Sequence, residues 1–137
     1  MEVNKLATFL KAIVQYGPKL ELNSTAQLDQ VAEWMAMRTS LNKSEVMMVL
    51  QEQSEALIHF GKNGTPVKLP GVGIFSPSID RNGEFSVNFR ADTALKNGIN
   101  APSAYRGGVK NKANIGIENE RLKALWDAEH PDDQLEL

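Results

Sequence analysis

Basic side chains are the residues of this sequence with the clearest chemical potential, and they gather in the middle of the chain. Residues 58–116 contain eight Lys or Arg and three Asp or Glu, a net charge of +5, whereas residues 1–57 carry −2 and residues 117–137 carry −5. This asymmetry favours a surface that faces a polyanion. A single basic residue is more often an ordinary solvated charge, so the hypothesis rests on the whole cluster. Its members are Lys62, Lys68, Arg81, Arg90, Lys96, Arg106, Lys110 and Lys112.

Other kinds of chemistry have little support in the residue types. The chain has no cysteine, which removes disulfides, thiolate zinc sites and cysteine nucleophiles together. Its only histidines are His59 and His130, and the segment 129–133 around His130 has the residue types of metal ligands but no fixed geometry. The glycines at residues 71 and 73 lack the Lys-Ser/Thr pair and the following helix of a phosphate loop. Since no nucleophile elbow or paired carboxylates appear, we expect no enzymatic activity, no metal, no cofactor and no small-molecule substrate.

The size of the chain suits one compact domain with extensions. It has 137 residues, of which 42% are apolar. No run approaches the roughly 18 uninterrupted apolar residues of a membrane span. The first residues also lack the charged and then apolar layout of a signal peptide. We therefore expect a cytoplasmic protein with no membrane partner.

The first 23 residues favour a pair of strands, with a helix as the alternative. Phe9 and Ile13 have the spacing of an apolar helix face, while the stretch from Phe9 to Tyr16 also suits a buried strand. After a Gly-Pro pair, residues 19–22 alternate between polar and apolar as a half-buried strand does. We therefore predict strands in this N-terminal extension.

Capping signals predict two helices after this extension. Ser24 precedes Gln27 at the spacing of a capping box, and Asn42 precedes Glu45 in the same way. The two helices should end near residues 38 and 61. The elements predicted beyond them are strands at 65–69, 74–79 and 85–89, a hairpin turn at Asn82-Gly83, a short helix at 92–97 closed by Gly98, an extended basic segment at 101–116, and an acidic helix at 118–129 anchored by Leu122, Leu125 and Trp126.

This order of elements resembles the HU and integration host factor family of histone-like bacterial DNA-binding proteins. The most specific motif is Val67-Lys68-Leu69-Pro70-Gly71-Val72-Gly73-Ile74-Phe75, which joins two strands through a glycine-punctuated turn. Its glycines suit positive φ and close approach of the chains. The resemblance covers residues 24–100 and leaves residues 1–23 and 101–137 outside, as in an HU-related subfamily with additional terminal segments. It implies an α+β fold and an intertwined homodimer whose paired sheets form a saddle over double-stranded DNA.

The chain departs from this family where the second and third strands join. In the family these strands continue into a long β-arm, tipped by an Arg-Asn-Pro motif whose proline wedges between base pairs. Here residues 80–84 connect the strands directly and contain no proline. The resemblance then implies binding to duplex DNA in the nucleoid through the phosphate backbone, with little sequence preference. The alternative is a structural or protein-interaction module that keeps the fold without significant DNA affinity.

Overall fold

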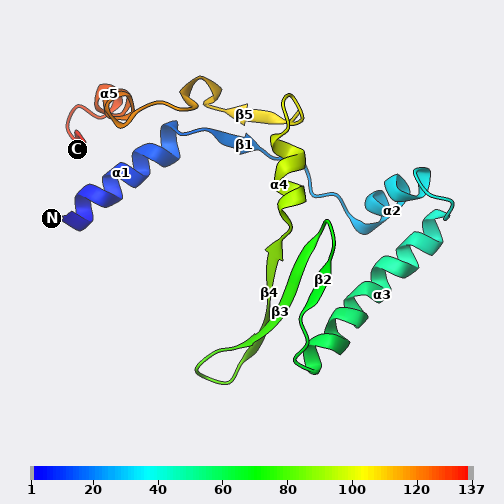
Figure 1. The fold of residues 1–137 in the computed structure, drawn as a ribbon. Helices are drawn as coiled ribbons and strands as arrows, with labels where there is room; N and C mark the ends of the chain where they lie inside the picture. Colours follow the sequence, from blue (N-terminus) through cyan, green and yellow to red (C-terminus); the bar gives the residue numbers. More distant parts are fainter. Residues whose placement is uncertain (1, 136–137) are drawn as a thin grey trace. The chain divides into compact units, whose positions relative to one another are not determined.

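The computed structural model describes residues 2–135 as two compact units with a mixed α+β fold (Figure 1). The terminal unit comprises residues 2–23 together with residues 106–135, and its side chains are described from Phe9 onward. The central unit comprises residues 24–105, so it continues five residues beyond the boundary expected from the sequence. Each unit has its own antiparallel sheet.

The terminal unit is built from two segments far apart in the sequence. Residues 9–16, favoured above as a strand, instead belong to a helix, and that prediction is wrong. This segment is helical because Phe9, Ala12 and Tyr16 recur at helical spacing and pack together against the last helix. Strand pairing does join the two segments, since Leu20 lies opposite Val109. The elements are α1 (Glu2–Tyr16), β1 (Lys19–Glu21), β5 (Gly108–Lys110), the 3₁₀ helix η1 (Lys112–Asn114) and α5 (Asn119–Glu129).

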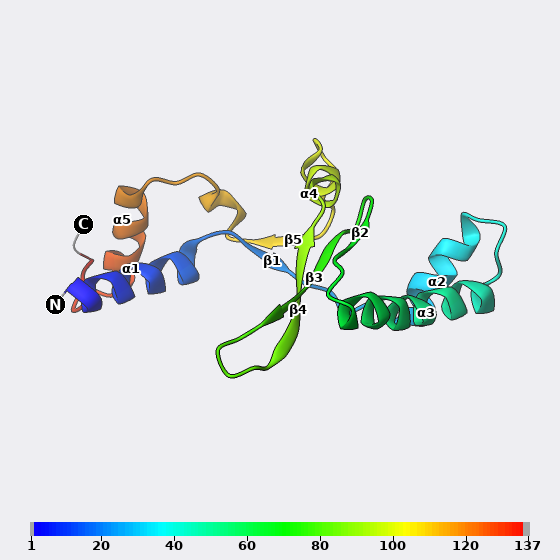
Figure 2. The ribbon, with the colours of Figure 1, turned by 60° about the horizontal axis from the view of Figure 1, so that its bottom comes forward.

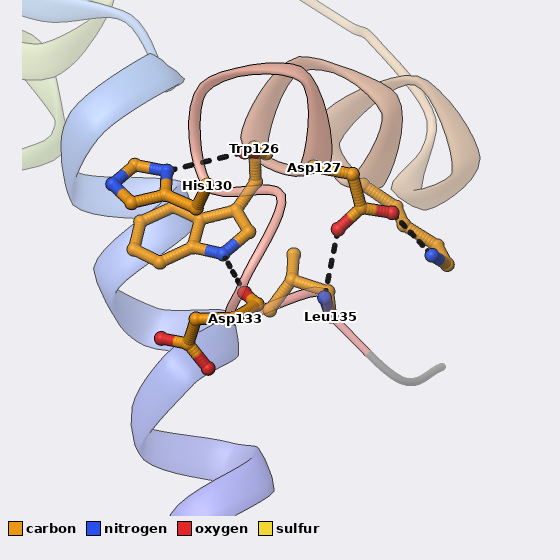
Figure 3. A network of polar contacts seen from close by, with 6 residues as sticks. Trp126, Asp127, His130, Asp133 and Leu135 are labelled. Carbon is orange, nitrogen blue, oxygen red and sulfur yellow. Dashed lines mark hydrogen bonds and ion pairs between the residues drawn. The ribbon is translucent and has the colours of Figure 1, made fainter.

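The core of the terminal unit lies between α1 and α5. The expected anchors Leu122 and Trp126 are buried, and Leu125 packs beside them. The Trp126 indole donates a hydrogen bond of 2.7 Å to the carbonyl of Asp133, while the His130 ring stacks on it at 3.8 Å between centroids (Figure 3). Leu135 is thereby held in the core. The terminal unit therefore buries an apolar centre of its own.

The carboxylate of Asp127 fastens the segment that follows α5. It accepts a hydrogen bond of 2.8 Å from the backbone N–H of Leu135 and another from the Lys123 ammonium (Figure 3). The hydrogen bond from Lys123 is the main reason that the pKa of Asp127 lies below its usual value.

On the other helix of this core, α1, burial raises the pKa of Tyr16 to about 12, with a further contribution from Glu129.

The central unit follows the predicted order of helices and strands, with shifted boundaries. Its first helix begins after its N-cap residue Gln27, whose backbone N–H donates a hydrogen bond of 2.9 Å to the side chain of Gln30, so the cap predicted at Ser24 lies three residues too early. Asn42 caps the second helix as expected, because its side-chain oxygen accepts a hydrogen bond of 2.9 Å from the N–H of Glu45. The elements are α2 (Leu28–Met37), α3 (Lys43–Lys62), β2 (Val67–Leu69), β3 (Gly73–Ile79), β4 (Phe85–Ala91) and α4 (Thr93–Asn100).

The three strands of the central unit form an antiparallel meander, as predicted, in the order β2-β3-β4 (Figures 1 and 2). Gly71 has a φ of +81°, which meets the predicted need for positive φ in the turn. Gly73 faces Ala91 in the register, and the ring of Phe89 lies over it. The helix after the meander does not stop at Gly98 but continues to Asn100.

The central unit buries little apolar surface. In its described residues, the apolar side chains that are buried are Val46 and Ala32, at the contact between α2 and α3. On β4, by contrast, Phe85, Val87 and Phe89 remain 77%, 62% and 51% exposed. Apolar patches of this extent are uncommon on monomeric proteins and mark interaction surfaces.

We predict that Gly73→Ala destabilises the central unit, because its Cβ would lie 2.4 Å from the carbonyl oxygen of Arg90 and 2.6 Å from the Phe89 ring. The matched control is Gly98→Ala inside α4, where an added Cβ meets nothing within 4 Å. This control should raise the free energy of unfolding by about 0.5–1 kcal/mol, because alanine loses less conformational freedom in a helix than glycine does. Urea unfolding followed by circular dichroism measures both. Equal stability of the two variants would contradict this account of the turn.

Candidate nucleic-acid interface

The register of the central sheet separates its side chains into two faces. Ser76 lies opposite Asn88 and Ser78 opposite Ser86, and the hydroxyls of the latter pair are 2.9 Å apart. Successive side chains alternate between faces, so these polar residues share one side. Phe75, Pro77 and Ile79, which pair with Phe89, Val87 and Phe85, occupy the other side. We call these the polar face and the apolar face.

Two of the basic candidates extend the polar face. Lys68 pairs with Ile74 across β2 and β3, and Ile74 pairs with Arg90 across β3 and β4. The three side chains therefore form one row across the sheet, on the same side as the serines. Lys68 and Arg90 are both exposed. The structure thus brings these two candidates together with a row of hydroxyl and amide groups.

Asp92 holds the edge of this face next to Lys68. Its carboxylate accepts a hydrogen bond of 3.1 Å from the N–H of Gly71 and one of 2.9 Å from the N–H of Ala94. It therefore joins the turn between β2 and β3 to the start of α4. These two backbone hydrogen bonds lower the pKa of Asp92, and the charge of Lys68 contributes further. The carboxylate therefore has a structural role beside the basic row.

The connection between β3 and β4 is a short closed loop. Asp80 and Glu84 pair through a backbone hydrogen bond of 3.0 Å, and Gly83 adopts a φ of +83°. The Asp80 carboxylate accepts from the N–H groups of Asn82 and Glu84 at 2.8 and 3.0 Å. Arg81 stands exposed in this loop. As the sequence predicts, the strands end here without a β-arm.

The other basic candidates lie on separate elements. Lys62 ends α3 and Lys96 lies on α4, both exposed and away from the row of Lys68 and Arg90 in the sheet register. Arg106, Lys110 and Lys112 belong to the terminal unit. The expected extended segment at 101–116 is in part a paired strand, because residues 108–110 form β5 against β1.

The structure also adds residues that the charge pattern missed. Asn88, Ser86, Ser78 and Ser76 complete the polar face, although none carries charge. Hydroxyl and amide side chains contact phosphates as Lys and Arg do. The alternation along β3 already places Ser76 and Ser78 on one side. Only the pairing of β3 with β4 reveals that Ser86 and Asn88 join them.

Comparisons with known proteins leave the site to be interpreted from its chemistry. Neither the family models nor the curated proteins include a match to this sequence. Among the described residues, no group of three or more His, Cys, Asp or Glu could hold a metal ion. None of the described helices is both long and apolar enough to cross a bilayer.

We predict that Asp92→Asn weakens the central unit at neutral pH and removes one component of its acid sensitivity. Since the folded state lowers the pKa of Asp92, its stabilising effect is present above the unfolded value of about 3.9 and is lost as the pH falls through the lower folded value. Urea unfolding at several pH values measures this. The difference in unfolding free energy between wild type and variant should shrink toward low pH. A difference that stays constant would contradict the role of the carboxylate.

Proposed function

We propose that this chain is a histone-like protein that binds double-stranded DNA as a homodimer. The polar face of the central sheet supplies the contacts, with Lys68 and Arg90 at one end and hydroxyl and amide groups along its length. These groups recognise phosphate oxygens, which every duplex presents whatever its sequence. Binding is therefore largely independent of sequence. The observation that carries this proposal is the common row of Lys68, Ile74 and Arg90.

The order of elements in the central unit supports the same proposal. Two helices, a three-stranded meander and a short helix follow one another, and the glycine-punctuated turn joins the first two strands. This is the order that the resemblance to the HU and integration host factor family implies. The short loop at residues 80–84 removes the arm, so insertion into the minor groove is not part of the proposed mechanism.

The uncovered apolar face supports a second copy as partner. Phe85, Val87 and Phe89 project from β4 into solvent, and α2 exposes Trp34 and Met37 as well. An 82-residue unit with so little buried apolar surface gains stability if a copy covers these residues. Two sheets joined by their apolar sides would leave their polar faces free, which is the arrangement that a DNA saddle requires.

A structural or protein-interaction role without DNA affinity is the second candidate. The short hairpin loop and the acidic residues of α5 favour it, since neither adds to attraction for a polyanion. Under this alternative the homodimer persists, and its polar face binds no nucleic acid. Titration with DNA separates the two candidates directly.

We predict that the wild-type chain binds duplex DNA saturably, with an affinity that falls steeply as salt increases. In the double variant Lys68→Gln, Arg90→Gln, the slope of log K against log salt should fall by about 0.9 for each phosphate that the variant no longer neutralises. The control Arg38→Gln, Lys43→Gln removes two positive charges from the α2–α3 end of the same unit. Fluorescence anisotropy at several salt concentrations measures all three. No binding at low salt would reject the proposal in favour of the alternative.

We predict that Val87→Asp prevents dimer formation, because it places a charge at the centre of the apolar face. The matched control is Asn88→Asp, which introduces the same residue one position along β4 on the polar face. Sedimentation equilibrium of the full chain measures the mass. We expect wild type and Asn88→Asp to be dimers and Val87→Asp to be a monomer. A monomeric wild type would remove the dimer from the proposal.

A further inference from the structure

Two lysines of the terminal unit stand directly opposite each other on the ribbon formed by β1 and β5. The register pairs Lys19 with Lys110. Residues paired in this way project from one side with their Cβ atoms about 4.5–5.5 Å apart, and like charges at such positions destabilise a sheet. Both lysines are exposed. Glu21 projects from the same side of the ribbon, and its carboxylate lies over Gly108. It forms no ion pair with either lysine, since the ion pair among the described residues joins Lys123 to Asp127 on α5.

Asparagine side chains fix the backbone beside Lys110. Asn111 donates hydrogen bonds of 2.9 and 3.0 Å to the carbonyls of Gln15 and Gly17, at the end of α1. Asn114 donates 2.8 Å to the carbonyl of Tyr16. The end of β5 is therefore tied to a helix that packs in the core, and the ribbon presents its lysines from a fixed frame. Pre-organisation of this kind reduces the cost of binding a ligand.

Charge within the terminal unit is divided between the ribbon and the last helix. Residues 17–23 and 106–114 carry four basic residues and one acidic residue, a net charge of +3. Residues 115–135 carry two basic and six acidic residues, a net charge of −4. An anion is thus attracted to the ribbon and repelled by the segment that contains α5.

We propose that this ribbon is a second phosphate-binding site for double-stranded DNA, with Lys19 and Lys110 as its contacts. The inference rests on the proposed function and adds a site outside the polar face of the central sheet. A phosphate near both ammonium groups relieves the repulsion between them, which gives the pair a reason to stand in register. Because both units belong to one chain, binding at the first site raises the effective concentration of DNA at the second.

The test is Lys110→Glu in the full-length chain. It replaces a repulsive pair by an attractive one, so thermal unfolding should occur at the same temperature or higher. DNA affinity should instead fall by about tenfold or more at low salt, with a smaller salt slope. The control Arg121→Glu makes the same charge change on α5 and should leave affinity within about twofold of wild type. Opposite effects on stability and binding are not expected of a residue with a merely structural role.

The outcomes distinguish this inference from the function on which it rests. If Lys110→Glu matches Arg121→Glu in affinity while Lys68→Gln, Arg90→Gln loses binding, the ribbon site is rejected and the proposed function stands. If the wild-type chain binds no duplex DNA, both are rejected. A second variant, Lys19→Gln with Lys110→Gln, removes the pair without adding an acid. It should also weaken binding, and wild-type affinity for it would overturn the ribbon site even if Lys110→Glu misfolds.

Discussion

The pairing register between β3 and β4 is the constraint on which the central unit depends. It places Phe75 against Phe89, with ring centroids 4.7 Å apart, and Ser78 against Ser86 on the other side. A slip of one residue would exchange the faces of an entire strand and mix phenylalanine with serine. The Asp80 turn holds the register at one end, and the fit of Phe89 over Gly73 holds it at the other.

The two units differ in how much apolar surface each buries within itself. The terminal unit closes its own centre, because Trp126 and Leu122 of α5 meet Ala12 and Tyr16 of α1. The central unit leaves its aromatic strand uncovered, and within its described residues the apolar side chains that it buries are Ala32 and Val46. Small domains gain limited stability from burial, so an uncovered face of this kind favours association. The same separation of faces leaves the polar side available to a ligand.

Local signals predicted the elements that depend on local contacts. Asn42 caps α3 because its partner Glu45 lies three residues away, and the glycine turn after β2 follows from backbone conformation alone. Sequence alone does not identify the helix α1, because its apolar residues suit a helix or a strand. Contact with α5, more than 100 residues later in the chain, selects the helix. For the candidate site, charge alone indicates Lys68 and Arg90, whereas their common row follows only from the strand register.

The division of the terminal unit into two distant segments has a consequence for how the protein is made. Tyr16 emerges from the ribosome long before Trp126, and at roughly 5–20 residues per second the delay is roughly 5–20 s. During this interval α1 lacks the surface of α5 that buries its apolar side. The strands of the central meander, by contrast, pair with strands that are next to them in the sequence and emerge within the same interval. Synthesis from the N-terminus therefore favours folding of the central unit first, and α1 can pack only after α5 has been synthesised.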